Sequence, residues 1–205
     1  MSKMKLFYVK GTCSLNPRIV INEIGLDVEF IKVDPTDKTT QDDEDYLSIN
    51  PKGSVPALML QNGEILTEGA IITQYLADST KSYNLLPELG NFKRFRVLEM
   101  VNHIATDIHK SCSPIFNRNV PNEIKDSVFK PILLQKLTGI NAILLNSHYL
   151  TGDEFTIADS YLFVVLSWMG RLQIDISSFA GIQNFIANSS KRNSVVKSLN
   201  DELNN

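Results

Sequence analysis

The chain has 205 residues, of which 43% are hydrophobic and 21% charged, an ordinary composition for a globular protein of one or two domains. Its net charge of −3 offers no basic surface to nucleic acid, and its longest apolar run, at 161–170, is too short for a membrane span of about 20 residues. The apolar run near the N-terminus is shorter than a secretory signal requires, and two cysteines without a CxxC pattern make neither a disulfide framework nor a zinc site. We therefore expect a cytoplasmic protein without bound metal, and no contact with nucleic acid or membrane.

The first 80 residues contain two supersecondary patterns. Two apolar runs separated by a helical segment predict a β-α-β unit, which requires a parallel crossover. Two later strand-like runs are joined by Asn62-Gly63, the strongest short-range signal for an antiparallel hairpin. A mixed sheet flanked by helices is therefore expected. In chain order we expect a strand at 5–9, a helix that starts at Ser14 or Asn16 and stops at Gly25, a strand at 28–34, a short helix at 45–49, strands at 57–61 and 64–67, and a helix capped by Thr67.

The second part of the chain shows only helical periodicity. Residues 81–91 contain Pro and Gly without a repeat, so we expect domain 1–80, a linker at 81–91 and an all-helical domain at 92–205. Thr156 and Asp159 form a capping-box pattern before a very apolar helix, and both are expected to be structural. Two apolar stripes with steps of three and four residues are expected to face the core: Phe95, Leu98, Val101, Ala105 and Ile108, then Ile132, Leu133, Leu137, Ile140, Ile143, Leu144 and Leu145.

Cys13 follows the first strand and stands at the start of the first helix. A thiol at a helix N-terminus is expected to have a lowered pKa, because unpaired N–H groups and the helix dipole stabilise its thiolate. Ser14 could donate a hydrogen bond to that thiolate or simply cap the helix. The residues alone leave a second interpretation open, in which Cys13 is a small buried hydrophobe. Asn16 stands where a resolving cysteine would be needed, so Cys13 could form a mixed disulfide with an external thiol but not an internal CxxC bridge.

Five segments in this order resemble the cytosolic glutathione transferases, and most closely their bacterial beta class: GTCSLNPR, INPKGSVPAL, LTEGAIITQYLAD, VNHIATDIHKSCSP and DEFTIADSYLF. The resemblance covers nearly the whole chain. It implies a thioredoxin-like N-terminal domain with the order βαβ-α-ββα and a helical-bundle C-terminal domain. It also implies glutathione as a co-substrate, with no other cofactor, and a homodimer with the long helix near Phe92–Asn117 at its interface.

The resemblance also implies roles for residues of the first domain. The Val55-Pro56 bond is expected to be cis, with the backbone of Val55 bound to the cysteinyl part of glutathione. Glu68 and Gly69, at a helix start, are expected to hold the γ-glutamyl ammonium and carboxylate groups. Lys38 is expected to meet the glycyl carboxylate. Many family members have Ser where this chain has Gly69, so one hydroxyl for the ligand is absent.

In the helical domain the resemblance makes one polar helix face, with Asn102, Thr106, His109 and Lys110, the wall of the binding cleft. His109 and Lys110 would face Cys13, and Asn102 would reach the glutathione of the neighbouring subunit. The plain alternative is a solvated face. Trp168 is expected in the core, and Cys112 is expected to be less reactive than Cys13. The hydrophobic staple at the capping box is expected to be weak, because Phe155 faces Ser160, and Tyr161 is a possible substitute partner.

The leading hypothesis is a glutathione transferase that adds the glutathione thiolate to small hydrophobic electrophiles, with Cys13, Ser14 and His109 as its catalytic residues. A second hypothesis is a glutathione-dependent thiol oxidoreductase or peroxidase in which Cys13 itself is the nucleophile and could form that mixed disulfide with glutathione. A third is a non-catalytic carrier of apolar ligands. The sequence does not identify the electrophile.

Overall fold

A computed structural model describes residues 3–204. The chain divides into two units, one formed by Met1–Ser82 together with Arg192–Asn205 and the other by Tyr83–Lys191. No helix among the described residues combines the length and apolar character that a membrane crossing requires.

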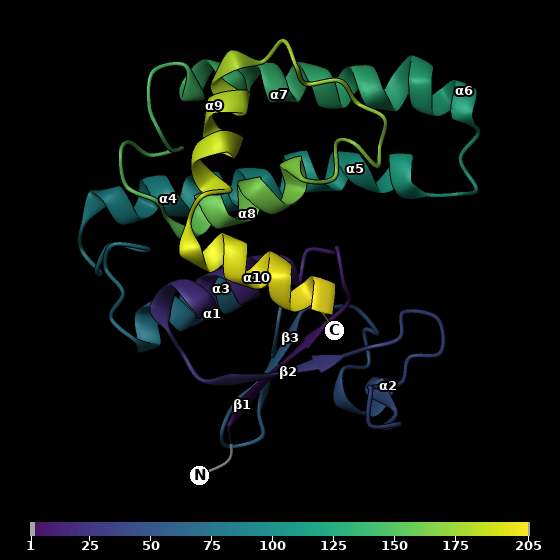
Figure 1. The fold of residues 1–205 in the computed structure, drawn as a ribbon, viewed down its shortest axis with the longest axis vertical. Helices are drawn as coiled ribbons and strands as arrows, with labels where there is room; N and C mark the ends of the chain where they lie inside the picture. The colour runs from purple at the N-terminus through teal and green to yellow at the C-terminus, as the bar shows by residue number, and fades with distance from the viewer. Residues whose placement is uncertain (1–2, 205) are drawn as a thin grey trace. The chain divides into compact units, whose positions relative to one another are not determined.

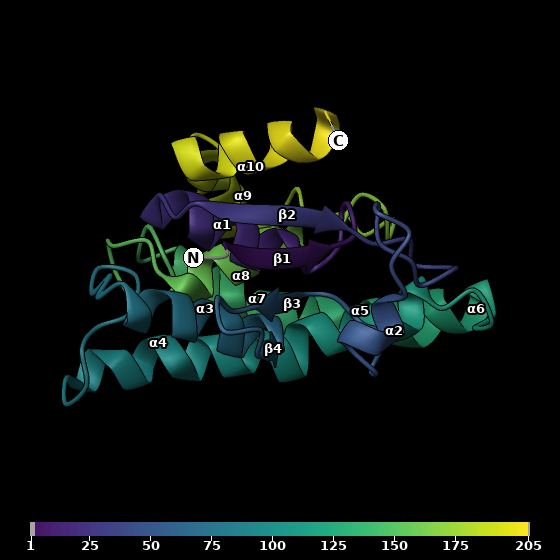
Figure 2. The ribbon, with the colours of Figure 1, turned by 90° about the horizontal axis from the view of Figure 1, so that it is seen from below.

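The first unit contains a four-stranded mixed sheet in the order β2-β1-β3-β4 (Figure 2). Strand β1 (Met4–Tyr8) pairs in parallel with β2 (Val28–Lys32) and antiparallel with β3 (Ala57–Met59). Strand β4 (Ile65–Thr67) completes the predicted hairpin with β3. The mixed sheet and the thioredoxin-like order of elements are therefore confirmed.

Helices cover both faces of this sheet. Helices α1 (Leu15–Ile24) and α3 (Gly69–Ser79) contact each other and lie on one side of the sheet (Figure 1). The short helix α2 (Tyr46–Ile49) places Tyr46 in a buried cluster with Phe7, Ile31 and Ala57 on the other face. Helix α1 ends at Gly25 in the left-handed conformation, as predicted.

The start of α3 differs from the prediction. Thr67 remains in β4, where it pairs with Ala57, so it does not cap the helix. The N-cap is Glu68, whose φ of 71° lies in the left-handed region that favours glycine. The strand and the helix thus meet without a loop, at a sharp turn on Glu68.

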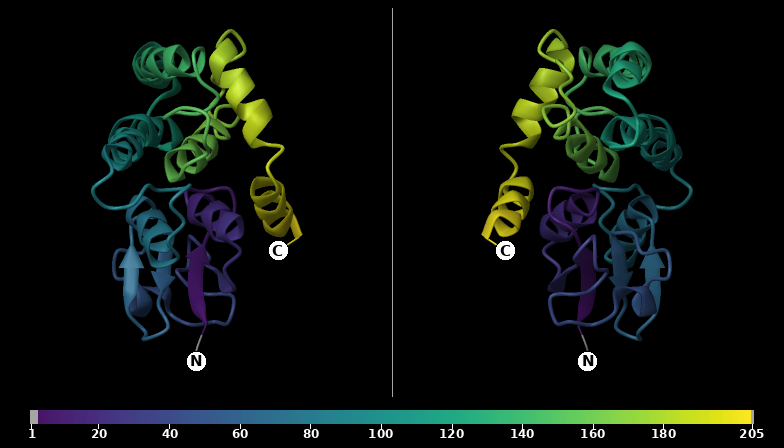
Figure 3. Two further views of the ribbon diagram at one scale, coloured as in Figure 1. Left: turned by 90° about the vertical axis from the view of Figure 1, so that its left-hand side faces the viewer. Right: turned by 90° about the vertical axis from the view of Figure 1, so that its right-hand side faces the viewer.

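The C-terminal helix α10 (Asn193–Asn204) also differs from the prediction, which placed it in the all-helical domain. It packs along α1 in the first unit (Figure 3). Val195 is fully buried, and Asn22 of α1 donates to the Ser198 hydroxyl at 2.8 Å. Periodicity predicts an amphipathic helix but not the surface against which its apolar side packs.

The second unit contains helices and no strand among its described residues. The most buried helix is α8 (Ile157–Leu166), all of whose residues are buried and which contacts α4 and α9. The helices are α4 (Phe92–His103), the π-helical turn η1 (Ile104–Ile108), α5 (His109–Phe116), α6 (Asn122–Ile124), the π-helical turn η2 (Lys125–Phe129), α7 (Lys130–Leu144), α8 and α9 (Ala180–Ser189).

The predicted stripe on α4 is correct only in part. Val101 and Ile108 are buried, but the Phe95 side chain is 59% exposed. The buried face runs instead through Arg94, Val97 and Val101. Val97 lies two positions, or about 200°, around the helix from Phe95. In the second stripe, Leu133, Leu137, Ile140 and Leu144 are buried, whereas Ile132 and Leu145 are exposed.

The capping box at the start of α8 is confirmed. Asp159 is fully buried and accepts hydrogen bonds from the Thr156 backbone at 2.8 Å and the Thr156 hydroxyl at 2.7 Å. It also accepts the backbone N–H of Leu150 at 2.8 Å, which fastens the preceding loop to the helix. The Phe155 ring is buried against Tyr149, with 5.4 Å between ring centroids.

Candidate functional site

Cys13 lies in the loop between β1 and α1 and is half-buried. Its Sγ donates to the Val55 carbonyl at 3.3 Å. Burial raises the pKa of the Cys13 thiol to about 11, a backbone hydrogen bond lowers it in part, and the negative charge of Glu68 adds to the rise. The lowered pKa expected from the sequence is therefore wrong for the ligand-free protein. Burial is the main cause, and the N–H groups of Leu15 and Asn16 are not free to offset it because they donate to carbonyls of the loop.

Ser14 is fully buried and organises the same loop. Its hydroxyl donates to the Val9 carbonyl at 3.0 Å, accepts the Val9 N–H at 3.2 Å and lies 2.9 Å from the Thr12 hydroxyl. It makes no side-chain cap of α1. Ser14 therefore holds the turn that carries Cys13, and the helix-cap interpretation is wrong. Its role as a partner of a thiolate stays a prediction.

The turn before β3 faces the Cys13 loop. The Val55-Pro56 bond is cis, as the resemblance predicts. The Ser54 carbonyl accepts hydrogen bonds from the Tyr46 hydroxyl at 2.7 Å and the Asn50 amide at 2.8 Å, two scaffold residues that sequence reasoning missed. Lys38, with a φ of 56°, donates from Nζ to the Gly53 carbonyl at 3.0 Å. Its ammonium group therefore lies at this turn.

The start of α3 completes this group. The exposed Glu68 carboxylate pairs with Lys52 Nζ at 3.1 Å, and Lys52 also donates to the Thr67 hydroxyl at 3.1 Å. Sequence reasoning assigned no role to Lys52, although it lies within the INPKGSVPAL segment. A Cβ added at Gly69 would lie 3.4 Å from Pro56 Cγ, which places these two residues side by side. The structure thus brings together Cys13, Val55, Pro56 and Gly69, and their backbone groups could hold an extended polar ligand.

In the helical unit, His109 lies in an aromatic cluster. Its Nδ1 is 2.7 Å from the Tyr161 hydroxyl, and its ring centroid is 4.9 Å from that of Trp168. Burial lowers the pKa of His109, and the positive charge of Lys110 lowers it further, so the imidazole is neutral at pH 7. Trp168 is buried, as predicted. Tyr161 was considered only for the staple, so its contact with His109 was missed.

The other predicted residues of this unit differ in exposure. Asn102, Thr106 and Lys110 are exposed, and the Thr106 hydroxyl donates to the Asn102 carbonyl at 2.9 Å. Cys112 is fully buried, and burial raises its pKa to about 12. Cys112 is therefore the less accessible of the two thiols.

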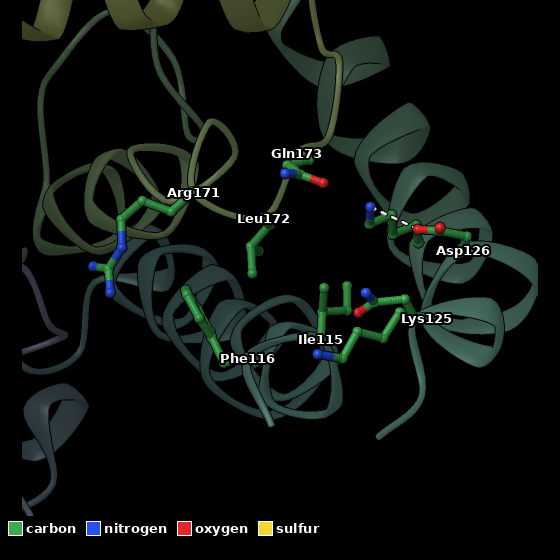
Figure 4. A pocket seen from close by; sticks show the side chains of 9 residues that line it. Ile115, Phe116, Lys125, Asp126, Arg171, Leu172 and Gln173 are labelled. Atoms are coloured by element: carbon green, nitrogen blue, oxygen red, sulfur yellow. Dashed lines mark ion pairs between the residues drawn. The ribbon is translucent and has the colours of Figure 1, made fainter. Parts of the chain in front are cut away.

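A cavity of about 310 Å³ in the helical unit contains none of the predicted site residues (Figure 4). Lys125, Lys130 and Arg171 line it, and Lys130 pairs with Asp126 at 2.7 Å. Between residues 3 and 204 there is no cluster of His, Cys, Asp and Glu side chains that could hold a metal ion.

Comparisons with known proteins identify the family. The N-terminal domain of glutathione S-transferases matches residues 2–78, and their C-terminal domain matches residues 113–193. Glutathione S-transferase GstA of Escherichia coli O157:H7 is 40% identical over 199 residues, which are 97% of this chain and 98% of that relative. The chain belongs to the glutathione S-transferase family. It is therefore a transferase by family, and the fold agrees.

Solved glutathione S-transferases have the same fold over nearly the whole chain. A sphingomonad glutathione S-transferase complexed with glutathione is 33% identical, with a TM-score of 0.92 and coverage of 97% of this chain and 98% of that one. A bacterial beta class glutathione S-transferase of Sphingomonas chungbukensis has the same identity, TM-score and coverage, 33%, 0.92, 97% and 98%. The resemblance to the bacterial beta class is thus confirmed.

Gly69 can accept a side chain in this glutathione S-transferase. The nearest atoms to an added Cβ, Pro56 Cγ at 3.4 Å and Asn16 Nδ2 at 3.9 Å, are at ordinary contact distance. We expect Gly69→Ala to raise the free energy of unfolding by about 0.5 kcal/mol, because it restricts the unfolded chain. Gly53→Ala is the matched control. It should cost about 1 kcal/mol or more, because Gly53 has a φ of +61° and its added Cβ would lie 3.1 Å from Leu47. Urea unfolding of both variants measures the difference, and destabilisation by Gly69→Ala would contradict the geometry.

Proposed function

We propose that this glutathione S-transferase adds the thiolate of glutathione to small hydrophobic electrophiles. The observation that carries the proposal is the group formed by Cys13, the cis Val55-Pro56 bond and Gly69 at the start of α3. In this proposal the backbone of Val55 binds the cysteinyl part of glutathione. The N-terminus of α3 at Gly69 receives the γ-glutamyl carboxylate, because free N–H groups at a helix start favour an anion.

Charged side chains complete the proposed glutathione site. The Glu68 carboxylate accepts from the γ-glutamyl ammonium group and also stays paired with Lys52, its present partner at 3.1 Å. Lys38 binds the glycyl carboxylate. To do so, its Nζ gives up the present hydrogen bond to the Gly53 carbonyl and donates to the ligand instead. Charge-assisted hydrogen bonds of this kind are the strong ones in recognition, so the site favours a zwitterionic peptide.

The protonation state of Cys13 decides between two chemical roles. With a pKa of about 11, Cys13 is a neutral thiol at pH 7 and can donate a hydrogen bond. In the proposed mechanism it donates to the sulfur of glutathione, which stabilises the glutathione thiolate as the nucleophile. The competing role, in which Cys13 attacks as a thiolate, requires glutathione binding to lower this pKa first.

The helical unit contributes to the proposal through residues that the resemblance assigns. His109, neutral and bound to Tyr161, and Lys110 are proposed to act in the reaction, and Asn102 is proposed to contact glutathione of a second subunit. We also propose a homodimer, the commonest assembly of soluble oligomers. A reducing, cytoplasmic location accords with two free thiols.

A panel of electrophiles assayed with glutathione tests the proposed function. We expect turnover of one or more aromatic or unsaturated electrophiles, with Cys13→Ala lowering kcat and not eliminating conjugation, because it removes a hydrogen-bond donor. Loss of all turnover together with thiol-disulfide exchange in Cys13→Ala would favour the oxidoreductase. Binding of apolar ligands without turnover of any electrophile would favour the carrier.

A further inference from the structure

Glu202, near the end of α10, is bound to the loop that carries Cys13. Glu202 is only 5% exposed, and its Oε2 accepts a hydrogen bond from the backbone N–H of Gly11 at 2.9 Å. Gly11 lies two residues before Cys13 and has a φ of 70°. A carboxylate from the far end of the sequence thus holds the turn between β1 and α1.

A buried arginine explains why a carboxylate is present at this position. Arg18 of α1 is fully buried, and its guanidinium carbon lies 4.1 Å from the ring centroids of both Tyr8 and Phe30. Within residues 3–204 its three side-chain nitrogens have no hydrogen-bond partner, and neither has Oε1 of Glu202. An uncompensated buried charge is costly. Burial raises the pKa of Glu202, and the Gly11 N–H and then the charge of Arg18 offset that rise in part.

Contacts at three levels hold α10 antiparallel to α1. At the start of α10, Glu23 pairs with Arg192 and accepts the Ser194 hydroxyl. In the middle, Asn22 donates to the Ser198 hydroxyl at 2.8 Å. The third level reaches the Cys13 loop through Glu202 with Gly11, and Lys10 Nζ also donates to the Leu203 carbonyl at 3.5 Å. The C-terminal end of α10 lies beside α1 (Figures 1 and 3). The middle contact therefore offers a control that loosens the same helix pair without touching the loop.

We propose that Glu202 is a positioning residue that fastens the loop 9–14 and thereby keeps the Cys13 thiol shielded against the Val55 carbonyl. The inference concerns the thiol itself and rests on the proposed function only in that Cys13 lies in the proposed glutathione site. Without the carboxylate, the Gly11 N–H loses its Glu202 acceptor, Arg18 loses a nearby negative charge, and water enters the loop. The Cys13 thiol then becomes easier to ionise and to modify.

Thiol alkylation and hydrogen exchange, both without glutathione, test the proposal on the full chain. Cys13 is alkylated with iodoacetamide at pH 8 and mapped by peptide mass spectrometry in wild type, Glu202→Ala, Glu202→Gln and Asn22→Ala. We expect Glu202→Ala to speed Gly11 amide exchange and Cys13 alkylation by about tenfold, the scale of one hydrogen bond to a charged group. Both rates in Glu202→Gln should lie between those of Glu202→Ala and wild type, because the glutamine amide oxygen can still accept the Gly11 N–H. Asn22→Ala should match wild type.

The pH profile separates positioning from loss of folding. In Glu202→Ala the midpoint of the Cys13 alkylation profile should fall from about 11 towards 9, while Cys112 stays slow. Faster alkylation of Cys112 in step with Cys13, equal effects of Asn22→Ala and Glu202→Ala, or an unchanged Cys13 profile would each overturn the proposal. If Glu202→Ala does not fold, Glu202→Gln decides by the same profile. If the proposal for Glu202 is overturned, the result of the electrophile panel does not change, so failure of this proposal and failure of the proposed function can be distinguished.

Discussion

Asp159→Ala is expected to lower the free energy of unfolding by about 3 kcal/mol or more, beyond the usual 0.5–2 kcal/mol for a lost helix cap. The reason is that Asp159 accepts from Leu150 and twice from Thr156 in a fully buried position. Truncation leaves two backbone N–H groups buried without an acceptor, and each such group costs about 1–3 kcal/mol.

The ionisation of Asp159 adds a pH dependence with a definite sign. Burial raises its pKa from 3.8 to about 6, against the hydrogen bonds that lower it. Between these pH values the folded protein binds a proton that the unfolded chain has released, so stability falls as pH rises from about 4 to 6. The total is roughly 3 kcal/mol, at about 1.4 kcal/mol for each pH unit. When Asp159 is protonated, the Thr156 hydroxyl can accept from the carboxyl group instead of donating to it.

Urea unfolding from pH 4 to pH 7 measures both effects. Asp159→Asn cannot titrate, so the stability of wild type relative to this variant should decline by roughly 3 kcal/mol across the range. Asp153→Asn is the control, because that carboxylate is 83% exposed and its ion pair, with His148 at 2.9 Å, lies at the surface. A parallel decline in the Asp159→Asn variant would assign the pH dependence to other groups.

Local patterns predicted the parts of the fold that local chemistry determines. Asn62-Gly63 predicted the hairpin because few dipeptides adopt its turn, and Thr156 with Asp159 predicted the start of α8 because the two groups lie three residues apart. Phe95 was misplaced because periodicity identifies an amphipathic helix more firmly than the phase of its buried face. The cis Val55-Pro56 bond was predicted from the resemblance, not from the local residues.

The features of the candidate site that the sequence did not predict depend mainly on tertiary contacts between residues far apart in the chain. Gly11 and Glu202 are 191 positions apart, and no local pattern relates them. Lys52 and Glu68 pair because the turn before β3 lies beside the start of α3. The sequence left Ser14 either as a donor to a thiolate or as a helix cap, yet its hydroxyl bonds to Val9, because buried backbone groups of the loop need partners.

In the ligand-free protein, the alkylation rate of Cys13 is expected to rise about tenfold for each pH unit from 7 to 10, without a plateau. The profile follows from a pKa of about 11, because only the thiolate reacts and its population grows with pH up to that value. At pH 7 the thiolate fraction is about 100-fold smaller than for a thiol with a pKa of 9.0. The more basic thiolate is about tenfold more nucleophilic, so Cys13 should react about tenfold more slowly than an unfolded reference.

A synthetic peptide of residues 9–17 supplies that reference, and Cys112, with a pKa of about 12, supplies an internal control that reacts more slowly still. Iodoacetamide labelling followed by peptide mass spectrometry gives all three rates. A plateau near pH 8 would show that Cys13 ionises readily. The Cys13 thiolate would then be the nucleophile, as in the competing oxidoreductase role. A steady rise to pH 10 leaves Cys13 protonated at neutral pH. Its sulfur then serves as a hydrogen-bond donor, and the nucleophilic thiolate of the proposed reaction comes from glutathione.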